Sequence, residues 1–199
     1  MSDQASRVGE VARKTSETDI FVRLRLDGTG VAKIGTGIGF LDHMLTALAR
    51  HGRFDLELSC AGDLAIDDHH TTEDCALALG QALGEALADR RGIRRFAHAF
   101  APLDEALARV VVDLSGRPAP VVELGLQRER LGDLACENAT HFFVSLAQTA
   151  KMAVHVDVLR GDNDHHRLEA AFKALALALR EAVAKDGHED IPSTKEVLV

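Results

Sequence analysis

Two short motifs in the sequence combine a histidine pair with a glutamate. The pattern His-His-x-x-Glu occurs at residues 69–73 and again at residues 165–169. On a helix, the first histidine and the glutamate are four positions apart, so their side chains lie one turn apart on the same face. A neutral imidazole and a carboxylate placed in this way can bind one divalent cation. The second histidine points about 100° away from the first, and it is therefore expected to reach a different ion.

Each motif follows a further histidine on a predicted helix. His43 lies in the segment FLDHML, 26 positions before His69 (69 − 43), and His141 begins the segment HFFVSL, 24 positions before His165 (165 − 141). Two copies in the same order and with nearly the same spacing indicate an internal duplication. We therefore predict one compact domain of two similar halves, residues 1–92 and residues 93–199, with the C-terminal tail in the second half.

Six histidines and two glutamates are the candidate metal ligands. If a pseudo-twofold axis relates the halves, one metal is held by the set His43, His69, Glu73 and His166. The other is then held by the set His141, His165, Glu169 and His70. The sequence leaves open the alternative that neighbouring subunits contribute ligands. Three nitrogens and one oxygen without a thiolate suit Mn, Fe(II), Co or Zn, although Zn usually prefers four-coordinate sites.

Hydrophobic periodicity predicts the elements that position these motifs. After a polar lead, we expect strands over residues 18–26, 53–59, 106–114, 121–126 and 151–159. Helices are expected over residues 40–51, 71–88, 138–150 and 166–185, followed by a tail without regular structure. The remaining histidines have no matching pattern and are expected to have structural or solvent-exposed roles: His51, His98, His155 and His188. His51 is expected to lie at the end of its helix, where a cation suits the helix dipole.

The composition excludes several classes of protein. There are 23 Lys and Arg residues against 31 Asp and Glu residues, and the net charge of −8 argues against a nucleic-acid-binding surface. Three cysteines without a CxxC pair do not indicate a disulfide framework, so a reducing cytoplasm is expected. The polar N-terminus does not resemble a signal peptide, and no long uncharged apolar run predicts a membrane span.

The motifs also resemble those of a known family. The segments IDDHHTTEDCALALG and GDNDHHRLEAAFKALA resemble the paired signatures of imidazoleglycerol-phosphate dehydratase, an enzyme family of histidine biosynthesis. Further similar segments follow the family order over about residues 13–195: TSETDIFVRLRLDGTG, GIGFLDHML, LDEALARVVVDLSGRP, HFFVSLA and PSTK. The resemblance implies an α/β (α+β) fold of duplicated ββαβα-type halves, with two mixed four-stranded sheets around a four-helix bundle. It also implies two Mn(II) ions per active site and a homo-oligomer of twenty-four chains built from trimers.

The family reaction removes water from imidazole glycerol phosphate and gives imidazole acetol phosphate. The hydrogen that is lost lies on a carbon without an adjacent carbonyl, so the imidazole ring must accept the electrons. Two cations, one near each ring nitrogen, would stabilise an imidazolate that expels the hydroxyl through a diazafulvene-like intermediate. The resemblance assigns acid/base roles to Glu17 and Asp104. It assigns substrate and phosphate contacts to Arg95, Arg117, Lys173, Ser193 and Lys195.

The assigned roles and function have alternatives, and the sequence departs from the family pattern at two positions. Glu17 could instead be a surface charge, and Asp104 could cap a helix. A dinuclear metallohydrolase is disfavoured because such sites usually use bridging carboxylates, and a metal-storage oligomer would not need the predicted phosphate contacts. Ala47 replaces a glutamine of the family pattern, and Glu196 replaces the glycine of its STKG tail. These two departures bear on substrate affinity more than on the chemistry.

Overall fold

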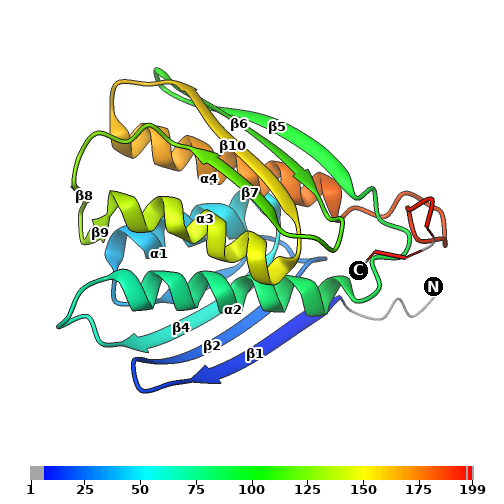
Figure 1. Ribbon diagram of the computed structural model, residues 1–199, viewed down its shortest axis with the longest axis horizontal. Coiled ribbons are helices and arrows are strands. Elements are labelled where there is room, and N and C mark those ends of the chain that lie inside the picture. Colours follow the sequence, from blue (N-terminus) through cyan, green and yellow to red (C-terminus); the bar gives the residue numbers. More distant parts are fainter. Residues whose placement is uncertain (1–6, 196, 199) are drawn as a thin grey trace.

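The computed structural model describes residues 7–195, 197 and 198, and in this part of the chain two four-stranded sheets enclose four helices (Figure 1). The first sheet has the order β1 (Val8–Lys14), β2 (Thr18–Arg25), β4 (Asp55–Gly62) and β3 (Ala32–Gly35). The second has the order β5 (Phe96–Leu103), β6 (Ala106–Asp113), β10 (Ala153–Arg160) and β7 (Ala119–Glu123). A short hairpin is formed by β8 (Arg130–Leu131) and β9 (Leu134–Ala135).

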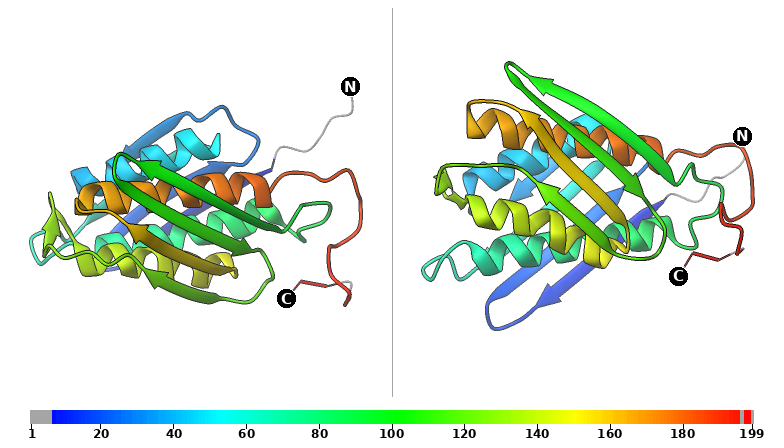
Figure 2. Two further views of the ribbon diagram at one scale, coloured as in Figure 1. Left: turned by 90° about the horizontal axis from the view of Figure 1, so that it is seen from above. Right: turned by 45° about the horizontal axis from the view of Figure 1, so that its top comes forward.

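The helices form a double layer between the sheets (Figures 1 and 2). They are α1 (Gly39–Gly52), α2 (His69–Leu87), α3 (Cys136–Ala150) and α4 (Asp164–Ala182). Helix α2 covers β1 and β2, and α4 covers β5 and β6. Between the layers, α1 packs against α4, and α2 packs against α3. Each helix of the first half therefore meets a helix of the second half. None of the described helices combines the length and apolarity needed to cross a membrane.

The two stretches of chain repeat one order of elements. The order β1-β2-β3-α1-β4-α2 recurs as β5-β6-β7-α3-β10-α4, with the β8–β9 hairpin added before α3. In both sheets the first three strands are antiparallel and the last strand is parallel to its neighbour. The expected fold class of two mixed sheets around four helices is confirmed. Each stretch has a third strand of its four-stranded sheet, β3 or β7, before its first helix, where the expected ββαβα order has two strands.

The predicted helices begin and end within three residues of the observed ones, whereas three strands of the two large sheets and both strands of the short β8–β9 hairpin were not predicted. In β1, the expected polar lead, Val11 is the only large buried side chain, so the apolar alternation is weak. In β5 the alternation is inverted. Phe96 and Phe100 face solvent, while small side chains such as Ala101 face α4. The four residues of β3 are too few to show a period.

The four helices begin at the same end of the molecule, and the C-terminal tail lies at the other end (Figure 1, left and right). The histidines of interest lie in the first or second turns of the helices, so this arrangement brings them to one end. The buried apolar residues of both sheets and all four helices form one continuous core beneath them. The site is thus supported by the whole domain.

The close approach of α2 and α3 provides a test of the packing. A Cβ at Gly80 would lie 2.2 Å from Thr149 Oγ1 and 2.5 Å from the carbonyl oxygen of Leu146. We expect Gly80→Ala to lower the free energy of unfolding by about 1–3 kcal/mol, because α3 must shift. Gly84→Ala is the matched control on the same helix, since its nearest neighbour would be 3.8 Å away. The control should be neutral or stabilising by up to about 1 kcal/mol in urea denaturation, and equal losses would contradict this description.

Candidate active site

The first candidate metal group lies between α1 and α4. Nε2 of His43 on α1 is 3.0 Å from Oε2 of Glu169 on α4, and Nε2 of His165, one turn before Glu169, is 3.1 Å from the same oxygen. Ligand atoms of these three residues all lie within 4.8 Å of one another. Two imidazole nitrogens and a carboxylate oxygen thus converge on one point, as expected for a divalent-cation site.

The second group lies between α2 and α3 and has the same composition. Nε2 of His69 is 3.4 Å from Oε2 of Glu73, and Nε2 of His141 on α3 is 3.3 Å from Oε1 of Glu73. The rings of His69 and His141 are stacked, with centroids 5.1 Å apart. The two groups correspond under the repeat of the chain, since α1 corresponds to α3 and α2 to α4.

The predicted division of the ligands within one chain is wrong. Each upstream histidine was expected to join the His–Glu pair of its own half, but His43 joins His165 and Glu169, and His141 joins His69 and Glu73. The reason is the helix packing, because α1 and α2 pack against helices of the other half. His70 and His166, which were expected to cross over, lie outside both groups.

A hydrogen-bonded chain behind His69 fixes the orientation of its ring. Nδ1 of His69 is 2.9 Å from Oδ1 of Asn138, and Nδ2 of Asn138 donates to Oδ2 of Asp68. Asp68 also accepts from the Ala135 amide and from Arg130. Because Asn138 Oδ1 can only accept, Nδ1 of His69 carries the proton, and Nε2 is left with its lone pair toward Glu73. Burial tends to raise the pKa of Asp68, but these donors outweigh it and lower that pKa.

The group at Glu169 is supported differently. Phe40 replaces Asn138 at the corresponding place, and its ring lies edge-on to His165 with centroids 5.0 Å apart. Lys173 Nζ is 2.7 Å from Oε1 of Glu169, whose side chain is only 13% exposed. Burial tends to raise the pKa of Glu169, but hydrogen bonds from Lys173, His43 and His165 lower it to about 2. Glu169 is therefore ionised and suited to hold a cation.

His70 and His166 belong to neither group and face carboxylates. Nδ1 of His70 is 3.0 Å from Asp63, and Nδ1 of His166 is 2.8 Å from Glu105. The hydrogen bond to Asp63 raises the pKa of His70, although desolvation opposes this. The hydrogen bond from His166, together with backbone amides, lowers the pKa of Glu105 to about 2. Asp63, Glu105 and Asn138 were not predicted, because single polar residues show no periodicity.

The two predicted acid/base residues occupy corresponding places. Glu17 lies in the turn between β1 and β2, with Oε1 3.7 Å from Nε2 of His70. Asp104 lies in the turn between β5 and β6, with Oδ2 3.8 Å from Nε2 of His166. Asp104 is 73% exposed and adopts a left-handed φ of 47° in this turn, so it does not cap a helix. Both carboxylates thus flank Nε2 of a partly exposed histidine at the end of the molecule where the four helices begin, which we call the metal end.

Four of the five predicted phosphate contacts line one cavity of about 600 Å³ beside the tail: Arg95, Arg117, Ser193 and Lys195. Arg95 also holds the tail in place, because it donates to both oxygens of Asp113 and to the carbonyl oxygen of Pro192. Lys173 lies elsewhere, on Glu169. Ala47 is buried on α1, one turn after His43. Glu196 lies outside the described residues.

The metal groups and this cavity lie at opposite ends of α4. His165 lies in the first turn of α4, and the amide of Arg95 donates to the carbonyl oxygen of Ala182 at the last residue of that helix. Seventeen residues of helix span about 26 Å at about 1.5 Å per residue. The metal end and the tail cavity of one chain are therefore separated by roughly the length of the helix.

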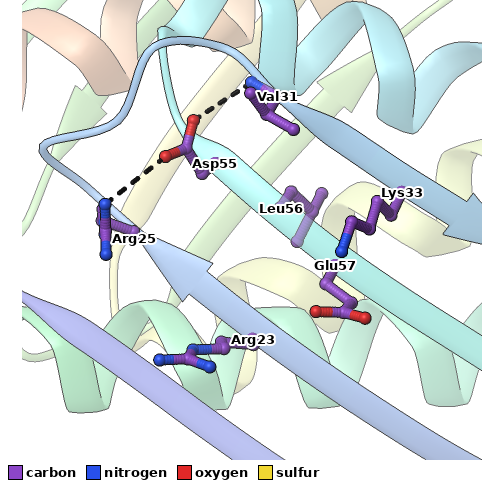
Figure 3. Close-up of a pocket in the computed structure, with 7 residues that line it drawn as sticks. All are labelled: Arg23, Arg25, Val31, Lys33, Asp55, Leu56 and Glu57. Atoms are coloured by element: carbon purple, nitrogen blue, oxygen red, sulfur yellow. Dashed lines mark hydrogen bonds and ion pairs between the residues drawn. The ribbon is translucent and has the colours of Figure 1, made fainter.

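Another depression, of about 230 Å³, lies over the first sheet (Figure 3). Arg25 Nη1 is 3.8 Å from Asp55 Oδ2, and the amide of Val31 donates to Asp55 Oδ1. Lys33 lies opposite Glu57 in the strand register. The cations there are balanced by neighbouring carboxylates, and neither the metal groups nor the predicted phosphate contacts reach this surface.

The four histidines without a pattern lie outside the metal groups. His98, His155 and His188 are exposed, the first two on the outer face of the second sheet. His51 lies in the last turn of α1 as expected, but burial and then the charge of Lys173 lower its pKa. This ring is therefore less readily charged than the helix-dipole argument implied.

Comparison with known proteins supports the family resemblance that the sequence motifs indicate. The family model described as imidazoleglycerol-phosphate dehydratase matches residues 36–179. The dehydratase of Candida glabrata is 57% identical over 94% of this chain and 98% of its own length. A relative from Phytophthora nicotianae is 60% identical over 96% of this chain, which spans 42% of that protein. The crystal structure of the Staphylococcus aureus dehydratase has a TM-score of 0.81 at 36% identity, and the match covers 89% of this chain and 99% of that chain.

These matches place the chain among the hydro-lyases, which remove water by breaking a carbon–oxygen bond. The chain belongs to the imidazoleglycerol-phosphate dehydratase family, which acts in histidine biosynthesis.

The hydrogen-bonded chain behind His69 can be tested by its effect on stability. Asn138→Ala removes the acceptor of His69 and one donor to the buried Asp68. We expect the free energy of unfolding to fall by about 1–3 kcal/mol, because both partners lose a hydrogen bond. Gln148→Ala, at an exposed position of the same helix, is the control and should change it by less than about 0.5 kcal/mol. Equal effects in urea denaturation would contradict the proposed support of His69.

Proposed function

We propose that this chain dehydrates imidazole glycerol phosphate with two divalent metal ions per active site, of which Mn(II) is our first assignment and other divalent metals are alternatives. The observation that carries the proposal is the pair of His/His/Glu groups, whose ligand atoms converge within 4.8 Å. Their donor set fits such an ion. Two neutral imidazoles and one carboxylate, without sulfur, suit Mn(II) and similar metals. The proton on Nδ1 of His69 also leaves the required Nε2 lone pair free.

Each group offers three ligands, so further ligands must come from elsewhere. His70 and His166 complete the sites in this proposal. Their Nε2 atoms face Glu17 and Asp104 and are not part of either group of their own chain, and each ring is held at Nδ1 by a carboxylate. We therefore assign them as ligands to metal groups of neighbouring chains, which is the alternative that the sequence left open.

The separation of the metal end from the tail cavity supports an active site shared between chains. The substrate is a three-carbon phosphate ester of an imidazole, far shorter than the roughly 26 Å along α4. It cannot contact the metal groups and the tail cavity of one chain together. A homo-oligomer that brings the metal end of one chain to the tail of another removes this difficulty. We propose the assembly that the family resemblance implies, twenty-four chains built from trimers.

The chemical roles follow from charge and position. When bound, two cations near the ring nitrogens would stabilise the imidazolate form of the substrate. Glu17 and Asp104 are the acid/base groups. One takes the carbon-bound proton, the hydroxyl leaves with a proton as water, and the resulting enol tautomerises to the ketone. Arg117, Ser193 and Lys195 bind the phosphate, while Arg95 orients the tail as well as adding charge. Lys173, which contacts Glu169 here, would be free to join the phosphate contacts if Glu169 held a cation.

Two other classes of function explain less of the structure. A dinuclear metallohydrolase would need a carboxylate that bridges its ions, whereas Glu73 and Glu169 belong to separate groups. A metal-storage protein would have no use for the cationic tail cavity at Arg117 and Lys195. The dehydratase proposal uses both ends of the chain.

Metal removal tests the proposal directly. Metal-free protein should give no ketone from imidazole glycerol phosphate, and reloading with Mn(II) should restore the activity, because the ring cannot accept electrons without the cations. Glu17→Gln is the matched variant. It should bind Mn(II) as wild type does but lose at least 100-fold in turnover, since it lacks the proton acceptor. Normal turnover in Glu17→Gln would remove Glu17 from the reaction. Phosphate-ester hydrolysis without ketone formation would overturn the dehydratase proposal.

Mixing of inactive variants tests the shared active site. Glu73→Ala damages the metal end, and Arg117→Ala damages the tail cavity. Each should be inactive alone. Dissociated and reassembled together, they should regain a substantial part of the activity, because some sites then combine an intact metal end with an intact cavity. An active site built within one chain predicts no recovery, and co-assembled wild type with Arg117→Ala calibrates the assay.

A further inference from the structure

The two outward-facing histidines share an arrangement that the metal groups do not explain. In both, the nitrogen held by a carboxylate is Nδ1, at 3.0 Å in His70 and 2.8 Å in His166. In both, Nε2 faces an acid/base residue, Glu17 at 3.7 Å from His70 or Asp104 at 3.8 Å from His166. A carboxylate that accepts from Nδ1–H fixes the tautomer and leaves the Nε2 lone pair available. If these histidines served only as surface residues, there would be no reason for a carboxylate to hold Nδ1, and not Nε2, in both halves.

The carboxylates that hold these rings are themselves fixed. The second oxygen of Glu105 accepts from the backbone amides of Asp162 and Asn163, in the loop before α4, at 3.1 and 2.9 Å. Asp63 is tied through its backbone, since its amide donates to the carbonyl oxygen of Glu17. Each carboxylate is therefore joined to the turn that carries an acid/base residue. Glu105 directly follows Asp104, and Asp63 is bonded to Glu17.

The two halves reach this arrangement with residues from different elements. Asp63 directly follows β4, seven positions before His70. In the second half, Leu159 stands seven positions before His166 and Gly161 directly follows β10, so no carboxylate is available at either place. Glu105 supplies it from the β5–β6 turn instead. The residue that corresponds to Glu105 in the first half is Thr18, which is buried against Asp74. The shared feature is thus the carboxylate at Nδ1, and its position in the sequence is not shared.

We infer that Asp63 and Glu105 are positioning residues that present Nε2 of His70 and of His166 as metal ligands to neighbouring chains. The inference rests on the proposed function, because it concerns ligands of the proposed metal sites. It adds two residues that contact neither substrate nor metal, and it explains why each lies beside an acid/base residue. The ligand that they prepare is a neutral imidazole with its proton on Nδ1.

Binding of Mn²⁺ to the assembled protein tests the inference. Free Mn²⁺ is measured by electron paramagnetic resonance during a titration of metal-free wild type, Asp63→Ala and Glu105→Ala. Each variant should weaken one class of site by about 10- to 100-fold and leave the other unchanged. Asp162→Ala removes a carboxylate from the same loop that forms no hydrogen bond among the described residues, and it should bind as wild type does. Glu105→Gln keeps an oxygen acceptor and should lie between wild type and Glu105→Ala, which guards against a folding defect in the alanine variant.

The ring tautomer gives a readout that needs no metal. In metal-free protein with ¹⁵N-labelled histidine, at alkaline pH where the rings are neutral, the proton should lie on Nδ1 of both rings. Glu105→Ala should lose this preference in His166 alone, and Asp63→Ala in His70 alone.

Three outcomes overturn the inference, and they are distinguishable. If the tautomers of the variants match wild type, the carboxylates do not position the rings. If wild type binds Mn²⁺ and both alanine variants bind as Asp162→Ala does, only the inference fails. If wild type binds no Mn²⁺, the proposed function fails first and the inference falls with it.

Discussion

The contact between helices of different halves is the constraint on which the candidate site depends. Each metal group takes its His–Glu pair from one helix and its third ligand from a helix of the other half, so neither half holds a complete group. This contact also places four helix N-termini together, each with about half a positive elementary charge. Such an end disfavours cations unless anions offset it. Glu73 and Glu169 lie in the second turn of their helices and supply that offset where a cation would bind.

The two candidate metal groups have the same residue composition but different surroundings. His69 is oriented by the buried chain from Asn138 through Asp68 to Arg130, whereas His165 meets the edge of Phe40. Glu169 bears the ammonium of Lys173, and the corresponding residue one turn after Glu73 is Leu77. A metal at Glu169 must therefore displace or tolerate a lysine, which a metal at Glu73 need not do. The repeat thus yields two sites of equal composition with unequal electrostatics.

The sequence could predict features that depend on a local period. The spacing of His69 and Glu73 on one helical face and the alternation over residues 18–26 are such features, and the structure has a helix from His69 and a strand over Thr18–Arg25. Local periodicity does not show which helices pack together, so the predicted division of ligands between the two groups was wrong. Strand β5 was not predicted, because α4 packs closely against it and leaves room only for small side chains on the inner face. The large apolar side chains therefore lie on the outer face, which inverts the usual alternation. Asn138 and Glu105 are single polar residues, and their roles follow only from the partners that the fold brings to them.

The distribution of charge along the chain follows from the same division into two ends. A net charge of −8 disfavours binding of a phosphate dianion at most of the surface, so the cations that bind it must be concentrated. Arg117 and Lys195 are concentrated at the tail, about one helix length from the carboxylates Glu17, Glu73 and Glu169. Separation within the chain keeps these opposite charges from neutralising each other in the monomer. They remain available to meet across a subunit contact, and the same contact would bring phosphate and imidazole of one small substrate to their respective partners. In the proposed function, assembly and catalysis would therefore share one electrostatic basis.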